Sequence, residues 1–167
     1  ANQSNIELIG DLPIFISHHS ADVWAHRELF QLDENGLPIV VAGVPPDYFS
    51  EMGQKWNTVL YNWAEHEKDN WTWWRMRMAR MLRLYDVVRI DHFRGFHSAW
   101  AVPREEENGI IGEWQEAPKE KIVEQLIEVA GDDSRIIAED LGIIPQEVID
   151  LRLKFNLKGM AVLQFGF

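Results

Sequence analysis

Two short stretches of the sequence decide the fold: VVRIDHFRGF at residues 87–96 and RIIAEDLG at residues 135–142. Each is an apolar strand pattern that ends in a carboxylate, Asp91 in the first and Glu139 in the second, and then breaks at a glycine. Burying a charge is costly unless it is paired or functional, so an acid at the end of a buried strand indicates a functional site. A helix-length connection separates the two stretches, which predicts parallel strands with both carboxylates at one end of the sheet. Glycosidic-bond chemistry uses such a pair, with one carboxylate as nucleophile and one as proton donor.

The rest of the chain alternates strand patterns with helical patterns. Strand patterns cover residues 6–16, 87–92, 135–139 and 159–167, with a shorter one at 37–44. Helical spacing of apolar residues covers 71–85, 119–130 and 145–155. Between them, we interpret residues 53–63 as an aromatic loop and residues 104–116 as a solvated hairpin or loop insertion. Strands that alternate with helices predict right-handed βαβ units, a parallel sheet of four strands and the α/β class.

The composition excludes several classes of partner. The chain has 167 residues and a formal net charge of −11, which repels phosphate backbones and anionic membranes. We therefore expect neither nucleic acid nor a membrane as partner, whereas a neutral sugar meets no repulsion. There is no cysteine, which removes disulfides and thiolate metal sites. No apolar run approaches transmembrane length, and we expect a cytoplasmic protein.

The candidate acids can be interpreted in two ways each. Alternate residues of a strand share a face, so Arg89 and Asp91 are expected to point the same way. The Arg89 guanidinium would keep Asp91 ionised, as a nucleophile must be. Equally, the two residues could form an ion pair that only stabilises the sheet. Glu139 suits a general acid, or a solvated acid at a strand end. Asp140 points the other way and is expected to cap the following segment. Asp11 interrupts a third strand and could lie in a turn.

Aromatic residues gather in loop-like sequence, where flat rings can stack on the C–H faces of sugars. The alternative is that they form small cores under long loops. The group comprises Trp24, Tyr48, Phe49, Trp56, Tyr61, Trp63 and Trp100. The histidines do not follow a metal-ligand spacing, and neither a phosphate-binding glycine loop nor a nucleophile elbow is present.

Seven segments together resemble the 4-α-glucanotransferases (amylomaltase, or disproportionating enzyme), which are relatives of the α-amylases. In order from residue 10 to residue 167 they are GDLPIFIS, SADVWA, VAGVPPDYFS, RIDHFRGF, WAVP, IIAEDLG and GMAVLQFGF. The resemblance implies that residues 1–167 are one segment of a catalytic (β/α)8 TIM barrel, incomplete at both ends. This partial barrel holds about the third to the sixth strand, with their helices and long active-site loops, because a full barrel takes roughly 250 residues.

The resemblance also implies roles for individual residues. Asp91 would be the nucleophile and Glu139 the acid/base of a retaining transfer between α-1,4-glucans. Substrate-binding roles would fall to six further residues: Arg89, His92, Asp11, Asp47, Tyr48 and Trp24. The partners would be maltooligosaccharides or starch-derived glucans. No metal or organic cofactor is implied, and the location would be the cytoplasm, or the plastid in a plant.

Part of the family pattern is altered or lies elsewhere. Residues 56–61 and 104–119 depart from it, and the family's third carboxylate would come after Phe167. We therefore expect a longer enzyme, and an isolated chain that is inactive and self-associates through exposed sheet edges. Two other interpretations stay open. One is an α-glucan hydrolase, and the other is a non-catalytic half-barrel that binds glucan or associates with itself.

Overall fold

The structure is a computed structural model that describes residues 2–48 and 50–166, and it contains two compact units. The first unit comprises Ala1–Ile14, Trp71–His97 and Pro118–Phe167. The second comprises Phe15–Asn70 and Ser98–Ala117. Each unit has its own sheet, with parallel strands in the first and antiparallel strands in the second, so the fold is mixed α/β.

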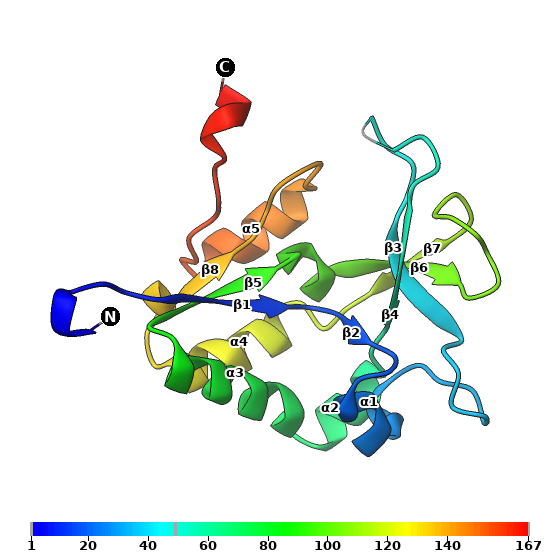
Figure 1. The fold of residues 1–167 in the computed structure, drawn as a ribbon, viewed down its shortest axis with the longest axis horizontal. Helices are drawn as coiled ribbons and strands as arrows, with labels where there is room; N and C mark the ends of the chain where they lie inside the picture. Colours follow the sequence, from blue (N-terminus) through cyan, green and yellow to red (C-terminus); the bar gives the residue numbers. More distant parts are fainter. Residues whose placement is uncertain (1, 49, 167) are drawn as a thin grey trace. The chain divides into compact units, whose positions relative to one another are not determined.

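The first unit is built on a parallel sheet with the strand order β1-β5-β8 (Figure 1). Its strands are β1 (Ile9–Pro13), β5 (Val87–Asp91) and β8 (Ile136–Ala138). Its helices are α3 (Thr72–Leu84), α4 (Glu120–Ala130) and α5 (Gln146–Lys154). Short 3-10 helices complete it at Asn2–Ser4, Phe93–Phe96, Asp133–Arg135 and Leu163–Gly166. Helix α3 packs against β1, β5 and α4.

Alternation along these strands separates a buried face from an accessible one. Val88 and Ile90 of β5 are almost fully buried, whereas Arg89 and Asp91 between them are only partly covered. On the buried side, Trp74 of α3 meets Phe96 edge to face, with ring centroids 5.1 Å apart. Because one face is buried by helices, the register fixes which side chains stay accessible on the other.

The second unit is built on an antiparallel sheet with the strand order β2-β4-β3-β6-β7. Its strands are β2 (Ile16–Ser17), β3 (Val40–Val44), β4 (Gln54–Val59), β6 (Ser98–Pro103) and β7 (Glu113–Glu116). Its helices are α1 (Ala21–Ala25), α2 (Trp63–Lys68) and a 3-10 turn at Arg27–Leu29.

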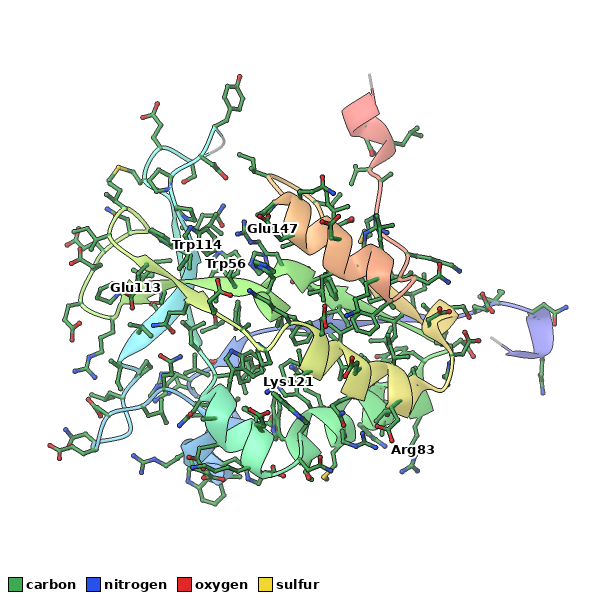
Figure 2. The ribbon with its side chains drawn as sticks, turned by 180° about the vertical axis from the view of Figure 1, so that it is seen from behind. Trp56, Arg83, Glu113, Trp114, Lys121 and Glu147 are labelled. Carbon is green, nitrogen blue, oxygen red and sulfur yellow. The ribbon has the colours of Figure 1, made fainter. Side chains whose placement is uncertain are left out.

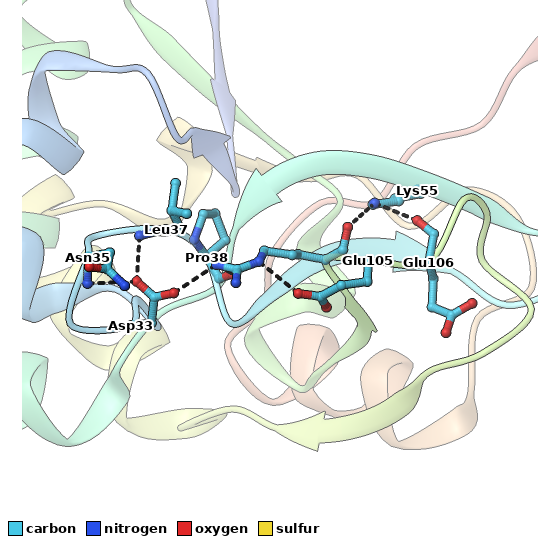
Figure 3. A network of polar contacts seen from close by, with 8 residues as sticks. Asp33, Asn35, Leu37, Pro38, Lys55, Glu105 and Glu106 are labelled. Carbon is cyan, nitrogen blue, oxygen red and sulfur yellow. Dashed lines mark hydrogen bonds and ion pairs between the residues drawn. The ribbon is translucent and has the colours of Figure 1, made fainter.

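A polar network braces the rim of this second unit (Figure 3). The Asp33 carboxylate accepts the backbone N–H groups of Asn35 and Leu37, both at 2.9 Å, and pairs with Arg104 at 2.8 Å. The neighbouring Lys55 ammonium donates to the carbonyls of Arg104 and Glu106, both at 2.6 Å. The Arg104 side chain lowers the pKa of Asp33 below its ordinary value. Asp33 is therefore ionised, and its hydrogen bonds stabilise the turn at residues 33–37.

The structure corrects three of the predicted elements. Residues 53–63 are not a loop, because they contain β4; Asn57 has φ +58°, which interrupts the two-residue alternation and hides the strand. Residues 6–16 divide between β1 and β2, which belong to different sheets; Pro13, which has no N–H group, ends β1. Within the described part of residues 159–167 there is no strand, since the only pairing nearby is the isolated bridge between Ile137 and Lys158. None of the described helices is long and apolar enough to cross a membrane.

Candidate active site

Arg89 binds two carboxylates on the accessible face of the parallel sheet. Its Nε lies 2.7 Å from Oδ1 of Asp11, and its Nη2 lies 2.8 Å from Oδ1 of Asp91. The register explains both contacts, since Asp11 is paired with Arg89 across β1 and β5, and Asp91 follows two residues later on the same face. The hydrogen bond that Arg89 donates to Asp11, reinforced by the charges of Asp91 and Glu139, raises the pKa of Arg89 above its ordinary value. The site therefore keeps a permanent positive charge between two acids.

Glu139 directly follows β8 and lies beside the end of β5. Ile90 is paired with Ala138 in the parallel register, so the next pair along the two strands is Asp91 and Glu139. Hydrogen bonds continue past the strand end, because Glu139 N–H donates to the carbonyl of Ile90 at 3.0 Å and Phe93 N–H donates to the carbonyl of Glu139 at 3.1 Å. The two carboxylates therefore leave neighbouring strands at the same end of the sheet.

Both carboxylate oxygens of Glu139 accept backbone N–H groups. Oε2 accepts from His92 at 2.7 Å, and Oε1 accepts from Leu141 at 2.8 Å. The first bond depends on a left-handed turn, because His92 has φ +54° directly after β5. This turn costs conformational energy in a residue other than glycine, and such strain occurs at functional sites.

The His92 imidazole is neutral at physiological pH. Burial, with a smaller contribution from the charge of Arg94, lowers its pKa to about 4. A neutral imidazole has one donor and one acceptor nitrogen, so it can bind a sugar hydroxyl without adding a charge beside the two acids. Among the described residues, no cluster of His, Asp and Glu side chains is arranged to hold a metal ion.

The family model described as 4-alpha-glucanotransferase matches residues 1–167. The chain belongs to this family. It is 50% identical to the 4-alpha-glucanotransferase of Thermus thermophilus over 167 residues, which are 100% of this chain and 33% of that protein. It is 47% identical to the chloroplastic/amyloplastic 4-alpha-glucanotransferase of Solanum tuberosum, again over 100% of this chain and over 29% of that protein.

A solved member of the family has the same fold. The amylomaltase from Streptococcus agalactiae, in complex with acarbose, superposes with a TM-score of 0.93 at 39% sequence identity. The match covers 99% of this chain and 33% of that one. The chain thus spans about a third of the length of the 4-α-glucanotransferases that it matches.

Three residues that the family resemblance implicates lie in the second unit. Asp47 closes a tight turn, in which its Oδ1 accepts the N–H of Ser50 at 2.8 Å. The side chains of Tyr48 and Trp24 are 92% and 84% exposed. Trp24 lines a cavity of about 340 Å³ with the neighbouring His18, His19 and Arg27.

The other aromatic residues divide between the two interpretations. Tyr61 is buried in a cluster with Phe30 and Trp63, at centroid distances of 5.5 and 4.7 Å, so the small-core interpretation is correct there. Trp56 on β4, which is labelled in Figure 2, stays partly accessible. It donates its indole N–H to Gln54 at 2.9 Å. Phe49 lies outside the described residues.

The structure corrects the expected role of Asp140. This carboxylate does not cap the next segment, but accepts the N–H of Met160 at 2.8 Å and pairs with Arg152 Nε at 2.9 Å. No local pattern could have revealed these contacts, because the partners lie 20 and 12 residues further along the chain. Met160 itself approaches the site, with its sulfur 3.9 Å from Nη1 of Arg89.

Proposed function

We propose that this chain is the central part of the (β/α)8 catalytic barrel of an enzyme that transfers α-1,4-glucan segments with retention of configuration. One observation supports the proposal most directly. Asp91 and Glu139 are the residues that follow the paired Ile90 and Ala138 at the ends of adjacent parallel strands, and Arg89 binds Asp91. Catalytic residues of (β/α)8 enzymes lie at this end of the strands. The likeness to the amylomaltase structure supports the barrel.

The first step forms a bond between Asp91 and the sugar. Arg89 holds Oδ1 of Asp91, and we assign Oδ2 to attack the anomeric carbon of the donor. Protonated Glu139 gives its proton to the glycosidic oxygen as the bond to the leaving glucan breaks. The product is a glycosyl ester on Asp91, and Glu139 is left as a carboxylate.

The second step reverses these roles. Glu139 takes the proton from a hydroxyl of the acceptor sugar, whose oxygen attacks the anomeric carbon and displaces Asp91. Each step inverts the anomeric centre, so the configuration is retained overall. We assign neutral His92 and Asp11 to sugar hydroxyls beside the reacting bond. Tyr48 and Trp24 present exposed rings that can stack on further glucose units, and Asp47 closes the turn on which Tyr48 lies.

The test uses Asp91→Asn and Glu139→Gln in the complete enzyme, with glucose and longer maltooligosaccharides measured after incubation with maltotriose. We expect each variant to lose at least about a hundredfold in transfer, since general acid catalysis alone contributes roughly 10²–10⁴-fold. Asp150→Asn, which changes an acid of α5 that bonds Gln146, is the matched control and keeps full activity. Near-normal transfer by either site variant would refute the proposal. Release of glucose without longer products by the unmodified enzyme would indicate a hydrolase instead.

A further inference from the structure

Asp140 is a largely covered charge placed directly beside the proposed acid/base. Its side chain is only 13% exposed and that of its partner Arg152 is 18% exposed, which makes this the most buried pair among the ion pairs described. The Asp140 carboxylate also accepts the Met160 N–H at 2.8 Å. Breaking up a buried pair leaves an uncompensated charge, so this carboxylate is fixed far more firmly than a surface acid.

The backbone to which Asp140 is bonded, around Met160, is itself held in place. Ala138 N–H donates to the carbonyl of Lys158 at 2.8 Å, and Arg152 Nη1 donates to the carbonyl of Leu157 at 2.8 Å. The backbone of residues 157–160 is therefore bonded both to β8 and to α5. Gly159 fits closely here, because a Cβ atom at this position would lie 2.6 Å from Oδ2 of Asp140.

Asp140 is joined directly to Glu139 along the chain, so its contacts also restrain the Glu139 backbone. Strand β8 ends at Ala138, so the Glu139 backbone has left the regular ladder, and on the β5 side it is held by the bonds to Ile90 and Phe93. On the opposite side the next anchor is the Asp140 side chain. The Glu139 Cα thus lies between two attachments, one through its own backbone and one through its neighbour's carboxylate.

We propose that Asp140 is a positioning residue that fixes Glu139 for proton transfer, through the hydrogen bond that it accepts from Met160 and its ion pair with Arg152. This inference rests on the proposed function, in which Glu139 is the acid/base. Proton transfer is sensitive to placement, since a displacement of about 1 Å can cost about a hundredfold in rate. A merely structural ion pair would affect every step of the reaction alike, whereas a positioning residue for Glu139 affects the step that needs its proton.

The decisive comparison uses two donors that differ in their need for an acid. Maltotriose has a sugar leaving group that must be protonated, whereas α-maltosyl fluoride releases fluoride without protonation. The variant is Asp140→Asn in the complete enzyme. The carboxylate uses one oxygen for the Met160 N–H and the other for the Arg152 guanidinium. The asparagine amide has a single oxygen and can replace only one of these contacts. We expect the single-turnover cleavage of maltotriose to fall by roughly 10–100-fold, while the release of fluoride in the first turnover changes little.

Three further variants complete the experiment. Glu139→Gln is the reference for losing the acid and shows the same selectivity more strongly. Gly159→Ala crowds the Asp140 carboxylate without changing a charge, and we expect it to show the same selectivity more weakly. It replaces Asp140→Asn in the comparison if that variant does not fold. Asp33→Asn is the matched control, because Asp33 also pairs with an arginine and accepts backbone N–H groups; it leaves both donors unaffected.

Each outcome has one meaning. Equal losses with both donors in Asp140→Asn, or no loss with either, overturn the positioning role. If Glu139→Gln discriminates between the donors and Asp140→Asn does not, only this inference fails. If Glu139→Gln itself shows no discrimination, the proposed role of Glu139 fails, and the function proposed above fails with it.

Discussion

The buried histidine of the second unit makes the stability depend on pH in a way that can be worked out from its surroundings. The His66 ring is fully buried among Tyr61, Trp63 and Phe30, at centroid distances of 5.3, 5.6 and 6.4 Å. Its Nε2 lies 3.2 Å from the carbonyl of Leu29. Because a carbonyl can only accept, Nε2 carries the proton in this contact. Burial lowers the pKa of His66 to about 4.

The sign and size of the effect follow from this pKa. In the unfolded chain a histidine has a pKa of about 6.5. As the pH falls below that value, the unfolded chain binds a proton that the folded chain does not bind until about pH 4. The free energy of unfolding therefore falls with falling pH across this window. Between pH 7.5 and pH 5.5 the contribution of His66 amounts to a loss of about 1.4 kcal/mol, a tenfold change in the unfolding equilibrium.

The assay is urea unfolding of the 167-residue chain, followed by tryptophan fluorescence at both pH values and one protein concentration. His66→Gln removes the titration, so its stability should fall about 1.4 kcal/mol less than that of the unmodified chain between the two pH values. Val59→Ala is the control, because Val59 is equally buried and its loss lowers stability by the same amount at both pH values. If the free energy of unfolding depends on pH equally in His66→Gln and in the unmodified chain, the pKa of His66 is not lowered by folding.

Two other predictions concern packing and the isolated chain. Gly10→Val should lower the free energy of unfolding by about 1–3 kcal/mol in urea titrations, because the Tyr85 ring fills the space that a side chain at residue 10 would need; unchanged stability would show that the ring moves away freely. The 167-residue chain alone spans about a third of the length of the related 4-alpha-glucanotransferases, so it should hold maltotriose too loosely to convert it, and it should form dimers or larger species through exposed strand edges. Light scattering measures the second effect, and a monodisperse monomer that disproportionates maltotriose would contradict both.

Local sequence signals predicted the three strands of the parallel sheet, but the fourth strand predicted at residues 159–167 is absent from the described residues. Alternation of apolar residues with Arg89 and Asp91 predicted β5 and the shared face, and the contact between these two side chains at 2.8 Å confirms it. The helical spacing of residues 71–85 and 119–130 predicted α3 and α4 to within a residue or two. These elements are recognisable because one face is buried and the other is not, which leaves a periodic trace in the sequence.

The antiparallel sheet could be predicted only in part. The strand pattern at residues 37–44 predicted β3, whereas β6 carries small residues such as Ala99 and Ala101, which give little hydrophobic contrast. The bond between Asp11 and Arg89 depends on β1 and β5 being neighbours although they are about 78 positions apart. Contacts of this kind are set by the topology and not by local propensity.

The most direct test of Asp91 as the nucleophile is to trap the sugar on it. The complete enzyme carrying Glu139→Gln, treated with α-maltosyl fluoride in the absence of acceptor, can form the glycosyl ester but resolves it slowly, because the base for the second step is missing. Proteolysis and mass spectrometry then locate the added maltosyl group. We expect the label on the peptide that contains Asp91, and no label when Asp91→Asn is added. A label on Asp11 or on any other residue would contradict it.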